Sequence, residues 1–421
     1  MKVLYIDGVG PFGGASRSLY EAVGAFAKGK VKAYFLIAKG TSLAYYSRLA
    51  EDLITTVGLT RFDNTVYSHY RGARWLILFR ELFHLPFTII SLIQARRRWK
   101  DIEVIHVNEL TEILPMLLAR WLFKVPVVVH VRSLTWNKAN SWRCRFVHYV
   151  LRNKVNAVIA IDESVRSSLP QDVPVHVVHN SFTPKSLPEP DREFLSKIDA
   201  IDPQTFKVGF VGNLLHAKGI FDLLEAAKII KDSGRKVDVL IVGDEARKGT
   251  GLKAWLLKRL GLSQDLKAEL VDKINQYGLT DDFHLLGSTP DIQRAYSRFD
   301  VLCFPSHFDA PGRPIFEAAF SGVPSIVAIN KPKPDTLIHL KTGLAIAEKD
   351  PKALADAILY FVDNPAETKD MGENARNLAR QNFSVTVNSQ LILNIYDSIV
   401  ADKVPVGSYS SYSSPTFTDN N

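Results

Sequence analysis

The chain has very little cysteine, and this scarcity excludes a fold held together by disulfides and a fold built on cysteine-bound zinc. Of its 421 residues, only Cys144 and Cys303 are cysteines. Two cysteines cannot form a disulfide framework, and their spacing fits no zinc site. Cys303 lies within an apolar run, where we expect a buried free thiol. This cysteine usage is typical of a protein in a reducing cytoplasm.

The sequence also lacks a long apolar run and the pattern of a secretory signal. It has no stretch of about 18 apolar residues, so we expect no membrane-spanning helix. Its first residues, 1–6, lead directly into a predicted strand, and we therefore expect no signal peptide. With 46% hydrophobic residues and a mean hydropathy near zero, the composition indicates a soluble globular protein.

Acidic residues are too few to balance the basic ones. The chain has 52 Lys and Arg against 44 Asp and Glu, a net charge of +8, and its pI is near 9.2. This excess favours an anionic partner, which is a phosphorylated substrate, an anionic membrane or a nucleic acid. The sequence holds no recognised nucleic-acid motif, and aromatic residues do not alternate with arginines as a stacking platform would need. We therefore expect no nucleic-acid partner.

Short apolar runs rich in β-branched residues alternate with helix-length amphipathic segments. Near-continuous apolar strands separated by helices are typical of parallel sheets covered on both faces. Two such series in one chain predict an α/β protein with two doubly wound, Rossmann-like domains. The predicted strands are 3–6, 33–37, 104–107, 127–131, 157–161, 175–178, 207–211, 237–242, 283–286, 301–304, 325–327 and 344–346.

A Pro-rich, charged stretch separates the two series of strands, because its composition disfavours both helix and strand. We expect a ligand to bind between the two domains, at the carboxyl ends of the strands. The predicted parts are an N-terminal Rossmann-like domain over 1–185, a linker over 186–204, a C-terminal Rossmann-like domain over 205–384, a final helix over 385–402 that could pack back on the N-terminal domain, and a disordered tail over 403–421.

The segment 212–219 follows a predicted buried strand and contains two glycines and a lysine. Glycines let backbone N–H groups approach a phosphate, and the helix that follows offers the positive end of its dipole. Lys218 would place its ammonium on a diphosphate. The alternative is an ordinary turn between a strand and a helix, with the lysine in solvent.

A second segment places two carboxylates around a loop broken by Gly312 and Pro314, where a helix opens. Asp309 could hold sugar hydroxyls, and Glu317 could hold a ribose hydroxyl pair, because a carboxylate accepts two hydrogen bonds from a vicinal diol. The alternative is a solvated carboxylate favoured by the helix dipole. Together with 212–219, this loop predicts a site for a phosphate-bearing sugar donor.

Residues after other predicted strands add to this site. Gly13-Gly14 is similar to a nucleotide-binding turn, but no acidic residue follows where the ribose of NAD would need one, so an oxidoreductase is disfavoured. His130 is the best candidate to touch a reacting group, and Asn180 could orient a ligand or a loop. A lone histidine beside a strand is, however, more often a satisfied structural residue.

Residues 69–100 carry arginines and a lysine around an aromatic and aliphatic stretch. This composition suits an interfacial helix on anionic lipid. The alternative is a helix packed on the core with a solvated basic end. The basic residues are Arg71, Arg74, Arg80, Arg96, Arg97, Arg98 and Lys100.

In their order along the chain, these segments resemble the retaining glycosyltransferases of family 4, across roughly residues 1–400. Each matching segment is weak alone, and their order and spacing make the resemblance specific. The matching segments are Gly13-Gly14, 101–107, 126–131, 157–163, 179–181, 211–219, 242–244, Pro305-Ser306 and 309–324.

The resemblance implies the GT-B architecture, in which two Rossmann-like domains face each other across a central cleft. It also implies that the domain over 1–185 binds the acceptor and that the domain over 205–384 binds the nucleotide sugar. The family motif of two glutamates separated by seven residues falls on Asp309 and Glu317, so aspartate stands where glutamate is usual. Asn213 stands where the family usually has an arginine beside the diphosphate, and Arg313 could supply that charge.

The remaining site residues are also implied by the resemblance. Lys218 matches the family's phosphate lysine, and His130 matches its crevice histidine near the reacting sugar. The donor-binding residues implied are Gly13, Gly14, Gly212, Asn213, Lys218, Gly312, Arg313, Pro314, Ile315 and Glu317, and the catalytic residues are His130, Asp309 and Lys218.

The resemblance further implies transfer of a sugar from a nucleotide sugar to an acceptor hydroxyl, with the anomeric configuration retained. It favours a UDP-sugar over GDP-mannose and implies neither a cofactor nor a metal for donor binding. The leaving phosphate would take the acceptor proton, and the acceptor would be a glycan or a lipid-linked molecule in cell-surface polysaccharide or glycolipid synthesis. The implied location is cytoplasmic, with 69–100 on the inner face of the membrane.

Two other functions stay open on sequence alone. A catalytically degenerate GT-B scaffold is motivated by Asp309 and Asn213. A GT-B epimerase or phosphorylase is disfavoured, because no lysine poised for pyridoxal phosphate can be identified. Donor-dependent product formation distinguishes a transferase from a scaffold.

Overall fold

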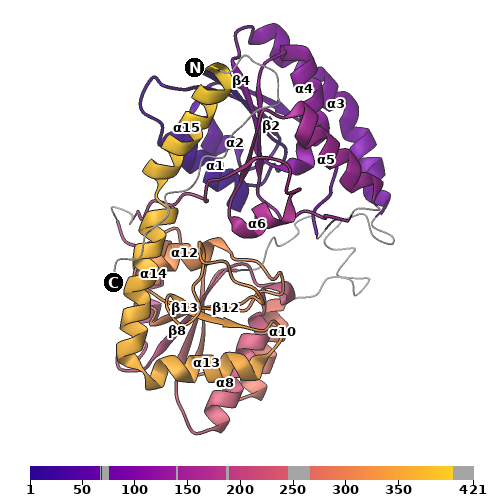
Figure 1. The fold of residues 1–421 in the computed structure, drawn as a ribbon. Coiled ribbons are helices and arrows are strands. Elements are labelled where there is room, and N and C mark those ends of the chain that lie inside the picture. The colour runs from indigo at the N-terminus through magenta and orange to yellow at the C-terminus, as the bar shows by residue number, and fades with distance from the viewer. Residues whose placement is uncertain (67, 69–74, 139–140, 186–188, 245–265, 402–421) are drawn as a thin grey trace. The chain divides into compact units, whose positions relative to one another are not determined.

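Two compact units make up the computed structural model, which describes residues 1–401 except 67, 69–74, 139–140, 186–188 and 245–265. The first unit comprises Met1–Ser181 and the C-terminal segment that begins at Val385, and the second comprises Phe182–Ser384. Each unit contains one parallel sheet (Figure 1).

The first unit is built on a seven-stranded sheet in the order β3-β2-β1-β4-β5-β6-β7, with every pair parallel. The strand order reverses between β1 and β4, and this is where a doubly wound sheet opens a crevice at its carboxyl edge. The strands are β1 (Lys2–Asp7), β2 (Lys32–Ala38), β3 (Ala50–Thr56), β4 (Val104–Val107), β5 (Val127–Val131), β6 (Ala157–Ala160) and β7 (Val175–Val177).

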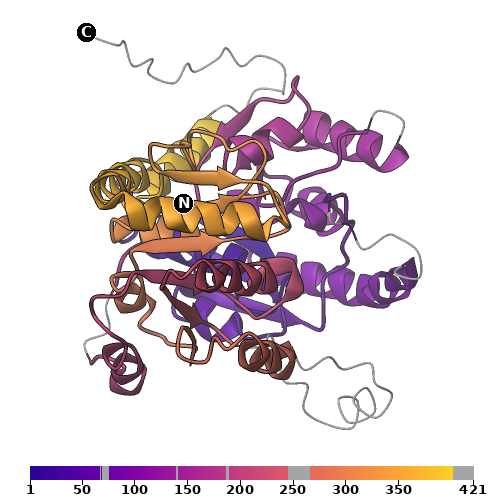
Figure 2. The ribbon, with the colours of Figure 1, turned by 90° about the horizontal axis from the view of Figure 1, so that it is seen from below.

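Helices cover both faces of this sheet, because successive side chains of a strand point to opposite faces. In β1, Leu4 and Ile6 belong to the apolar cluster beneath α3, α4 and α5, whereas Val3 and Tyr5 belong to the cluster beneath α1 and α15 (Figures 1 and 2). The helices are α1 (Gly14–Gly24), α2 (Leu43–Tyr46), α3 (Ile77–Arg98), the short 3₁₀ turn η2 (Leu110–Glu112), α4 (Ile113–Phe123), α5 (Trp142–Lys154), α6 (Glu163–Ser168) and α15 (Val385–Ala401).

The C-terminal helix α15 packs on the first unit, although it follows the whole second unit in sequence. Ile392, Ile395 and Tyr396 are buried in the cluster that includes residues of α1. The Tyr396 hydroxyl lies 2.6 Å from His106 Nδ1 on β4. Burial lowers the pKa of His106 to about 3, so this imidazole is neutral at physiological pH.

The second unit contains a six-stranded parallel sheet in the order β10-β9-β8-β11-β12-β13. Its strand order reverses between β8 and β11, which is the equivalent of the reversal in the first unit. The strands are β8 (Lys207–Val211), β9 (Asp238–Val242), β10 (Phe283–Gly287), β11 (Val301–Phe304), β12 (Ser325–Ala328) and β13 (Gly343–Ile346).

The second sheet is also covered on both faces. One apolar cluster joins the strands to α8, α10 and α13, and another joins them to α7, α11 and α12. The helices are α7 (Arg192–Asp199), the 3₁₀ turn η3 (His216–Lys218), α8 (Ile220–Asp232), α10 (Leu266–Gln276), α11 (Ile292–Tyr296), α12 (Arg313–Phe320), α13 (Pro351–Asp363) and α14 (Pro365–Asn382).

All the predicted strands are present, and the sequence analysis missed one, β3. This strand carries Glu51 and Asp52 and lies at the edge of the sheet. Edge strands often carry charged residues, which discourage pairing with another chain. Its apolar signal is therefore weaker than that of the central strands.

The range predicted as a linker differs in the structure, because part of it forms α7. Phe194 and Ile198 are buried on the sheet of the second unit, and Asp191 caps the helix by accepting a hydrogen bond from the Phe194 N–H at 3.1 Å. The proline-rich start of the range hid this short amphipathic segment. The predicted tail, 403–421, lies outside the described residues, as do 186–188.

The helix α3 corrects the expectation that the chain has no segment able to cross a membrane. In the part of the chain that the structure describes, this one helix is long and apolar enough by length and composition. Glu81, Thr88 and Ser91 interrupt its apolar run, and a search for an unbroken run therefore passes over it. Length and composition alone are also met by some helices of soluble proteins.

Candidate functional site

The candidate donor site lies in the second unit, where the strand order reverses. The loop after β8 contains Gly212, Asn213 and Lys218, and the loop after β11 contains Asp309 and leads into α12. Since β8 and β11 are neighbours in the sheet, their carboxyl ends bring the two loops side by side. The structure thus unites the two segments that the sequence analysis linked.

Backbone contacts fasten these two loops together. The His307 N–H donates to the Ala217 carbonyl at 3.0 Å. Gly219 has φ +72°, and a Cβ built on it would lie 1.9 Å from the Pro305 carbonyl oxygen. Only glycine fits at this close approach, and Gly219 is also the residue from which α8 begins.

Gly219→Ala is expected to destabilise the protein by more than the roughly 1–2 kcal/mol that a left-handed alanine costs, because the added methyl also collides with Pro305. Gly234→Ala is the matched control, since Gly234 has φ +75° but no atom within 4 Å of the built Cβ. Urea unfolding measures both changes in the free energy of unfolding. Equal losses in the two variants would contradict the proposed collision.

Lys218 is half-buried between two aromatic rings. Its Nζ lies 5.2 Å from the centroid of Phe304 and 5.3 Å from that of Phe308. Burial lowers the pKa of Lys218, and among the described residues no side chain forms an ion pair with its ammonium. A partly desolvated cation without a carboxylate partner is well suited to bind an anion.

The start of α12 also approaches the Phe304 ring. A Cβ on Gly312 would lie 2.3 Å from Cζ of that ring, so glycine is required where the loop passes over it. Gly312 is the N-cap residue, and no side chain caps the helix. The N-terminus of α12 and the Lys218 ammonium thus both lie near one aromatic ring, and both favour negative charge.

Pro314 and Ile315 are placed in the first turn of α12, but they offer little for direct contact. Pro314 has no N–H to donate. The Ile315 side chain is buried with Val327, Ile329 and Leu337, and its N–H donates to the Gly312 carbonyl. The structure therefore gives Ile315 a packing role.

Glu317 is buried and each of its carboxylate oxygens already has a partner. Oε1 accepts from Arg313 Nε at 2.9 Å, and Oε2 accepts from the Tyr296 hydroxyl at 2.9 Å. The Arg313 side chain is 12% exposed and that of Glu317 is 5% exposed. The alternative of a solvated carboxylate is therefore wrong, and Arg313 is held within its own helix by Glu317.

Asp309 is exposed and stands in a strained backbone conformation. Its φ is +44°, which is uncommon for a residue other than glycine. Oδ1 accepts from the Asn330 N–H at 2.7 Å. This bond connects the loop to Asn330, two residues after the end of β12. The second carboxylate oxygen of Asp309, Oδ2, remains for another contact. Strained residues of this kind cluster at binding sites.

Gly212 and Asn213 lie at the opening of the loop after β8. The Gly212 N–H donates to the Val242 carbonyl at 3.0 Å, and a Cβ on the adjacent Gly243 would lie 1.9 Å from the Gly212 carbonyl oxygen. The loop thus runs directly beside the loop after β9. Asn213 is exposed.

The other predicted site residues belong to the first unit. Gly13 is the N-cap residue of α1, which no side chain caps, and Gly14 is its first residue. A Cβ on Gly13 would meet no atom within 4 Å, so this turn has open space in front of it.

His130 lies on β5 and is buried. Its Nδ1 is 3.3 Å from a terminal nitrogen of Arg132, and its Nε2 has no hydrogen-bond partner among the described residues. Burial lowers the pKa of His130 well below its ordinary value, and the charge of Arg132 lowers it further. His130 is therefore a neutral imidazole that offers a hydrogen bond rather than a proton.

Sequence reasoning missed the polar residues that surround His130. Arg132 donates to Asn108 Oδ1 at 2.7 Å and to Asn180 Oδ1 at 2.8 Å, which places Asn180 as a support for this arginine. Glu109 accepts from the Ser133 hydroxyl at 2.9 Å, and burial raises its pKa. The signal in the sequence that could have revealed them is the presence of polar residues just after the apolar strands β4 and β5.

Two family models match the chain, one after the other. Residues 12–185 match the model described as Glycosyltransferase Family 4, and residues 191–378 match the model described as Glycosyl transferases group 1. The chain belongs to glycosyltransferase family 4. The two models together span most of both units, and they confirm the resemblance and identify the chain as a transferase enzyme.

Individual relatives of this glycosyltransferase are distant. The chain is 24% identical over 328 residues to the lipopolysaccharide core biosynthesis mannosyltransferase LpsB of Rhizobium meliloti (strain 1021), covering 77% of this chain and 85% of LpsB. It is 25% identical over 309 residues to the mannosyltransferase LpcC of Rhizobium leguminosarum bv. viciae, covering 73% of this chain and 81% of LpcC.

Solved structures show the same fold at low identity. HepE of Anabaena, solved in complex with UDP, has a TM-score of 0.71 and 20% identity, with 94% of this chain and all of HepE covered. This likeness confirms the predicted fold class, an α/β protein of the GT-B type with two Rossmann-like units.

Proposed function

We propose that this glycosyltransferase moves a sugar from a nucleotide sugar, with a UDP-sugar favoured over GDP-mannose, to an acceptor hydroxyl with retention of configuration. One observation carries the proposal. The Lys218 ammonium, which has no carboxylate partner among the described residues, and the uncapped start of α12 both lie near the Phe304 ring at the reversal of the strand order. This is where an anionic diphosphate fits best.

The bond changes define what these residues would do. The bond between the anomeric carbon and the phosphate oxygen breaks, the acceptor oxygen bonds to that carbon on the same face, and the leaving phosphate takes the acceptor proton. Negative charge grows on the diphosphate. Lys218 and the amides around Gly312 would stabilise that charge, and backbone amides near Gly14 would assist. With these groups, donor binding needs no metal.

The carboxylates would orient the donor. A carboxylate offers about four acceptor sites, and Glu317 uses two of them on Arg313 and Tyr296. Its remaining sites could accept the ribose hydroxyls. Asp309 Oδ2 could accept from a sugar hydroxyl, and the neutral His130 could donate from Nε2 to the reacting sugar.

A thermal-shift screen tests the donor assignment. UDP, GDP and ADP and their common sugar conjugates are compared with and without magnesium. A ligand at 100 times its Kd adds about 2.7 kcal/mol of stability, which a melting curve resolves. A shift with UDP-sugars that magnesium leaves unchanged supports the proposal, and a shift with GDP-mannose alone would overturn the donor preference. Donor-dependent product formation tests transfer itself.

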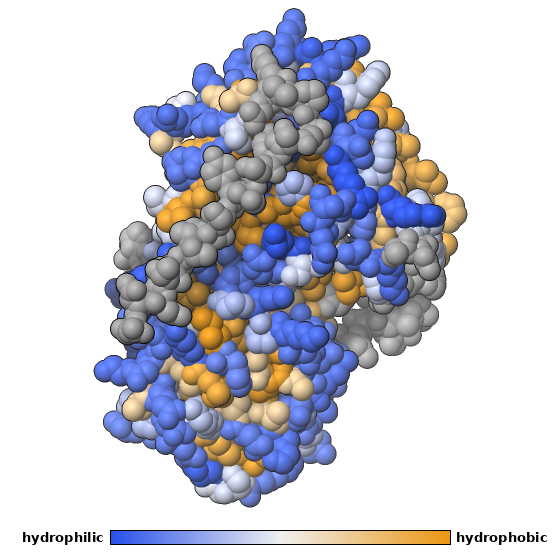
Figure 3. All heavy atoms as spheres, viewed as in Figure 1, coloured by the Kyte–Doolittle hydropathy of each residue, from blue (hydrophilic) through white to orange (hydrophobic). Residues whose placement is uncertain are grey.

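We further propose that the enzyme works on the inner face of a membrane, in cell-surface polysaccharide or glycolipid synthesis, with α3 in contact with the lipid. Over residues 77–91 the polarity of α3 is reversed relative to an ordinary surface helix, whereas Leu92 and Ala95 near its end are buried in the apolar cluster. Its buried positions include Glu81, Thr88 and Ser91, whereas Phe79 and Leu82 are 70% and 63% exposed. Figure 3 shows hydrophobic residues along the edge of the first unit where α3 lies in Figure 1.

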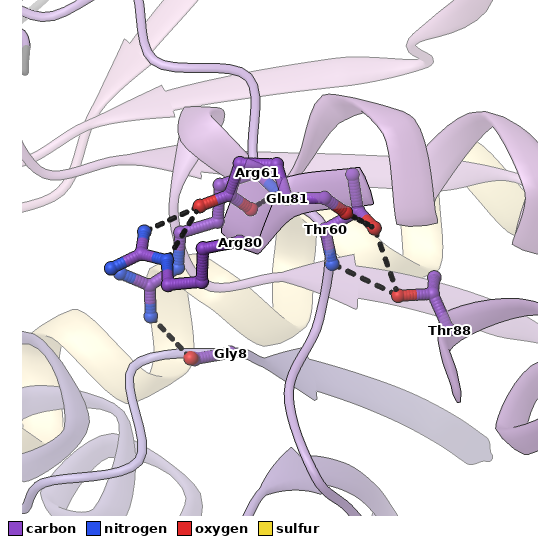
Figure 4. A network of polar contacts seen from close by, with 6 residues as sticks. All are labelled: Gly8, Thr60, Arg61, Arg80, Glu81 and Thr88. Carbon is purple, nitrogen blue, oxygen red and sulfur yellow. Dashed lines mark hydrogen bonds and ion pairs between the residues drawn. The ribbon is translucent and has the colours of Figure 1, made fainter. Parts of the chain in front are cut away.

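Hydrogen bonds stabilise the polar side of α3 against the protein. The Thr60 N–H donates to the Thr88 hydroxyl at 2.9 Å, and the Arg61 N–H donates to Glu81 Oε2 at 2.7 Å (Figure 4). The inward face is therefore fixed by polar contacts, which leaves the apolar face outward. Leu76, Phe83 and Ile90 extend this exposed face.

Basic residues at the end of α3 fit an anionic lipid surface. Arg97 and Lys100 are exposed, whereas Arg98 is paired with Asp52. Two exposed cations contribute about 1 kcal/mol each on an anionic surface, so the apolar face supplies most of the binding. Arg71 and Arg74 lie outside the described residues.

The double variant Phe79→Gln, Leu82→Gln is expected to lose at least about tenfold in its partition onto vesicles, since each buried Phe or Leu contributes roughly 1.5–3 kcal/mol. Both side chains are exposed, so the melting temperature should not fall. Leu340→Gln is the control, because Leu340 is 58% exposed in the other unit. Equal sedimentation of variant and wild type, or of wild type with neutral and anionic vesicles at low salt, would contradict the proposal.

A further inference from the structure

A polar hollow in the first unit contains none of the residues assigned to the donor site. Its volume is about 200 Å³. It lies at the carboxyl edge of the sheet, between Val9 after β1, Glu109 after β4 and Ser133 after β5, and the first turn of α3 closes it. This is the reversal of strand order in the first unit, where doubly wound sheets bind ligands.

The lining of the hollow suits an uncharged polyol. Asp63, Glu81 and Glu109 provide carboxylates, and Arg61 and Arg80 provide guanidiniums, and three hydroxyl side chains also line it. The lining thus offers both acceptors and donors, as the hydroxyls of a sugar ring require. Because carboxylates outnumber guanidiniums, a diphosphate would be disfavoured there.

The size of the hollow indicates that it holds one part of a larger molecule. Sites for drug-sized ligands measure roughly 300–1,000 Å³, so about 200 Å³ holds little more than a single sugar unit. Contacts within the protein hold the arginines that line the hollow in place before any ligand binds. Figure 4 shows that Arg61 contacts the Gly8 carbonyl, and that Arg80 donates to Glu81 Oε1, with Nε at 2.9 Å.

The wall formed by α3 continues directly into the exposed apolar face. Ile77, Arg80 and Glu81 line the hollow, whereas Leu76 and Phe79, in the same turn, are 67% and 70% exposed. A molecule whose polar head lies in the hollow therefore has an apolar surface beside it. One helix offers both surfaces that an amphiphilic molecule needs.

We propose that the hollow binds the uncharged sugar head of a lipid-linked acceptor, and that its lipid chain leaves along the apolar face of α3. The inference rests on the proposed transfer to a membrane acceptor and names the residues that select it. The head and the lipid chain are recognised together, so a sugar without a chain binds weakly.

Binding of alkyl glycosides without any nucleotide sugar tests this inference. The probes are the octyl and methyl glycosides of glucose, galactose, mannose and N-acetylglucosamine, each below its micelle concentration, titrated against the full chain. At least one octyl glycoside should bind at least about tenfold more tightly than its methyl counterpart. Equal affinities for every pair, or no binding of any octyl glycoside, would overturn the proposal.

Variants separate the hollow from the apolar face. Arg80→Gln with Thr111→Val should weaken octyl glycoside binding at least about tenfold, and Thr111→Val alone removes one hydroxyl from the lining with little change of shape. Arg145→Gln is the control, because Arg145 is exposed on α5 of the same unit, and this variant should bind the glycoside as the wild type does. If both hollow variants bound the octyl glycoside with unchanged affinity, the proposal that the hollow binds the sugar head would be wrong.

This test is independent of the proposed function. Glycoside binding needs no donor, so it can succeed where the transfer assay fails. Sedimentation with neutral phosphatidylcholine vesicles should be unchanged in the hollow variants, because the apolar face of α3 is intact. Loss of vesicle binding in these variants would show that the substitutions disturb α3 rather than the hollow.

Discussion

Glu317→Ala is expected to reduce sugar transfer at least about tenfold, which corresponds to about 1.4 kcal/mol or more in the barrier, and to lower the melting temperature as well. The carboxylate holds Arg313 in a pair whose side chains are 12% and 5% exposed. Removing one partner of a buried ion pair costs roughly 3–5 kcal/mol, because the other charge stays desolvated after its ion-pair partner is lost.

The measurements are transfer rates well below the melting temperature and melting curves for each variant. Glu193→Ala is the matched control, since Glu193 forms an (i, i+4) pair with Lys197 whose side chains are 84% and 46% exposed. An exposed pair of this kind contributes about 0–1 kcal/mol. Glu317→Gln keeps an oxygen acceptor and should fall between alanine and wild type. Wild-type transfer in Glu317→Ala would remove Glu317 from the site.

Lys218→Met is expected to lose at least about tenfold in transfer while the folded state keeps or gains stability. The ammonium is partly desolvated, and its pKa is lowered by burial. The folded state therefore carries a charge that it solvates poorly, and methionine removes this cost while it keeps the contacts with Phe304 and Phe308. Loss of function with gain of stability is typical of a binding-site residue.

The pH dependence gives a second readout for Lys218. Its folded pKa lies below the ordinary value of 10.5. Between the two pKa values the unfolded chain binds more protons, so the free energy of unfolding of the wild type rises with pH in that window. The stability gained by Lys218→Met should thus be largest below the lowered pKa and should vanish above about 10.5.

Lys352→Met is the control for this experiment, because Lys352 is exposed and pairs with Asp356 on the surface. Its transfer rate should match that of the wild type. A Lys218→Met enzyme that binds UDP and transfers sugar normally would contradict the role of the ammonium at the diphosphate.

The strands and the two loops of the donor site could be predicted from sequence, because both depend on local signals. Apolar runs specify buried parallel strands, and glycines mark where backbone groups approach closely. The partners of Glu317 could not be predicted in this way. Tyr296 comes from α11, and only the three-dimensional packing brings its hydroxyl to the carboxylate.

The reversed polarity of α3 was also beyond the sequence pattern. An amphipathic segment shows that a helix has two faces, and it does not show which face is inward. Thr60 and Arg61, which fix the inward face, are contributed by the segment after β3, the strand that the sequence analysis missed. The hollow at the start of α3 depends on the same contacts.

The placement of α15 sets the order in which the chain can complete its folding during synthesis. The second unit ends at Ser384, so it has all its residues before α15 has been made. The first unit lacks Ile392, Ile395 and Tyr396 of its core until α15 leaves the ribosome. Domains commonly fold from the N-terminus onward as they emerge. Here the N-terminal unit is completed after the second unit, and one face of its sheet stays incompletely covered until α15 has been made.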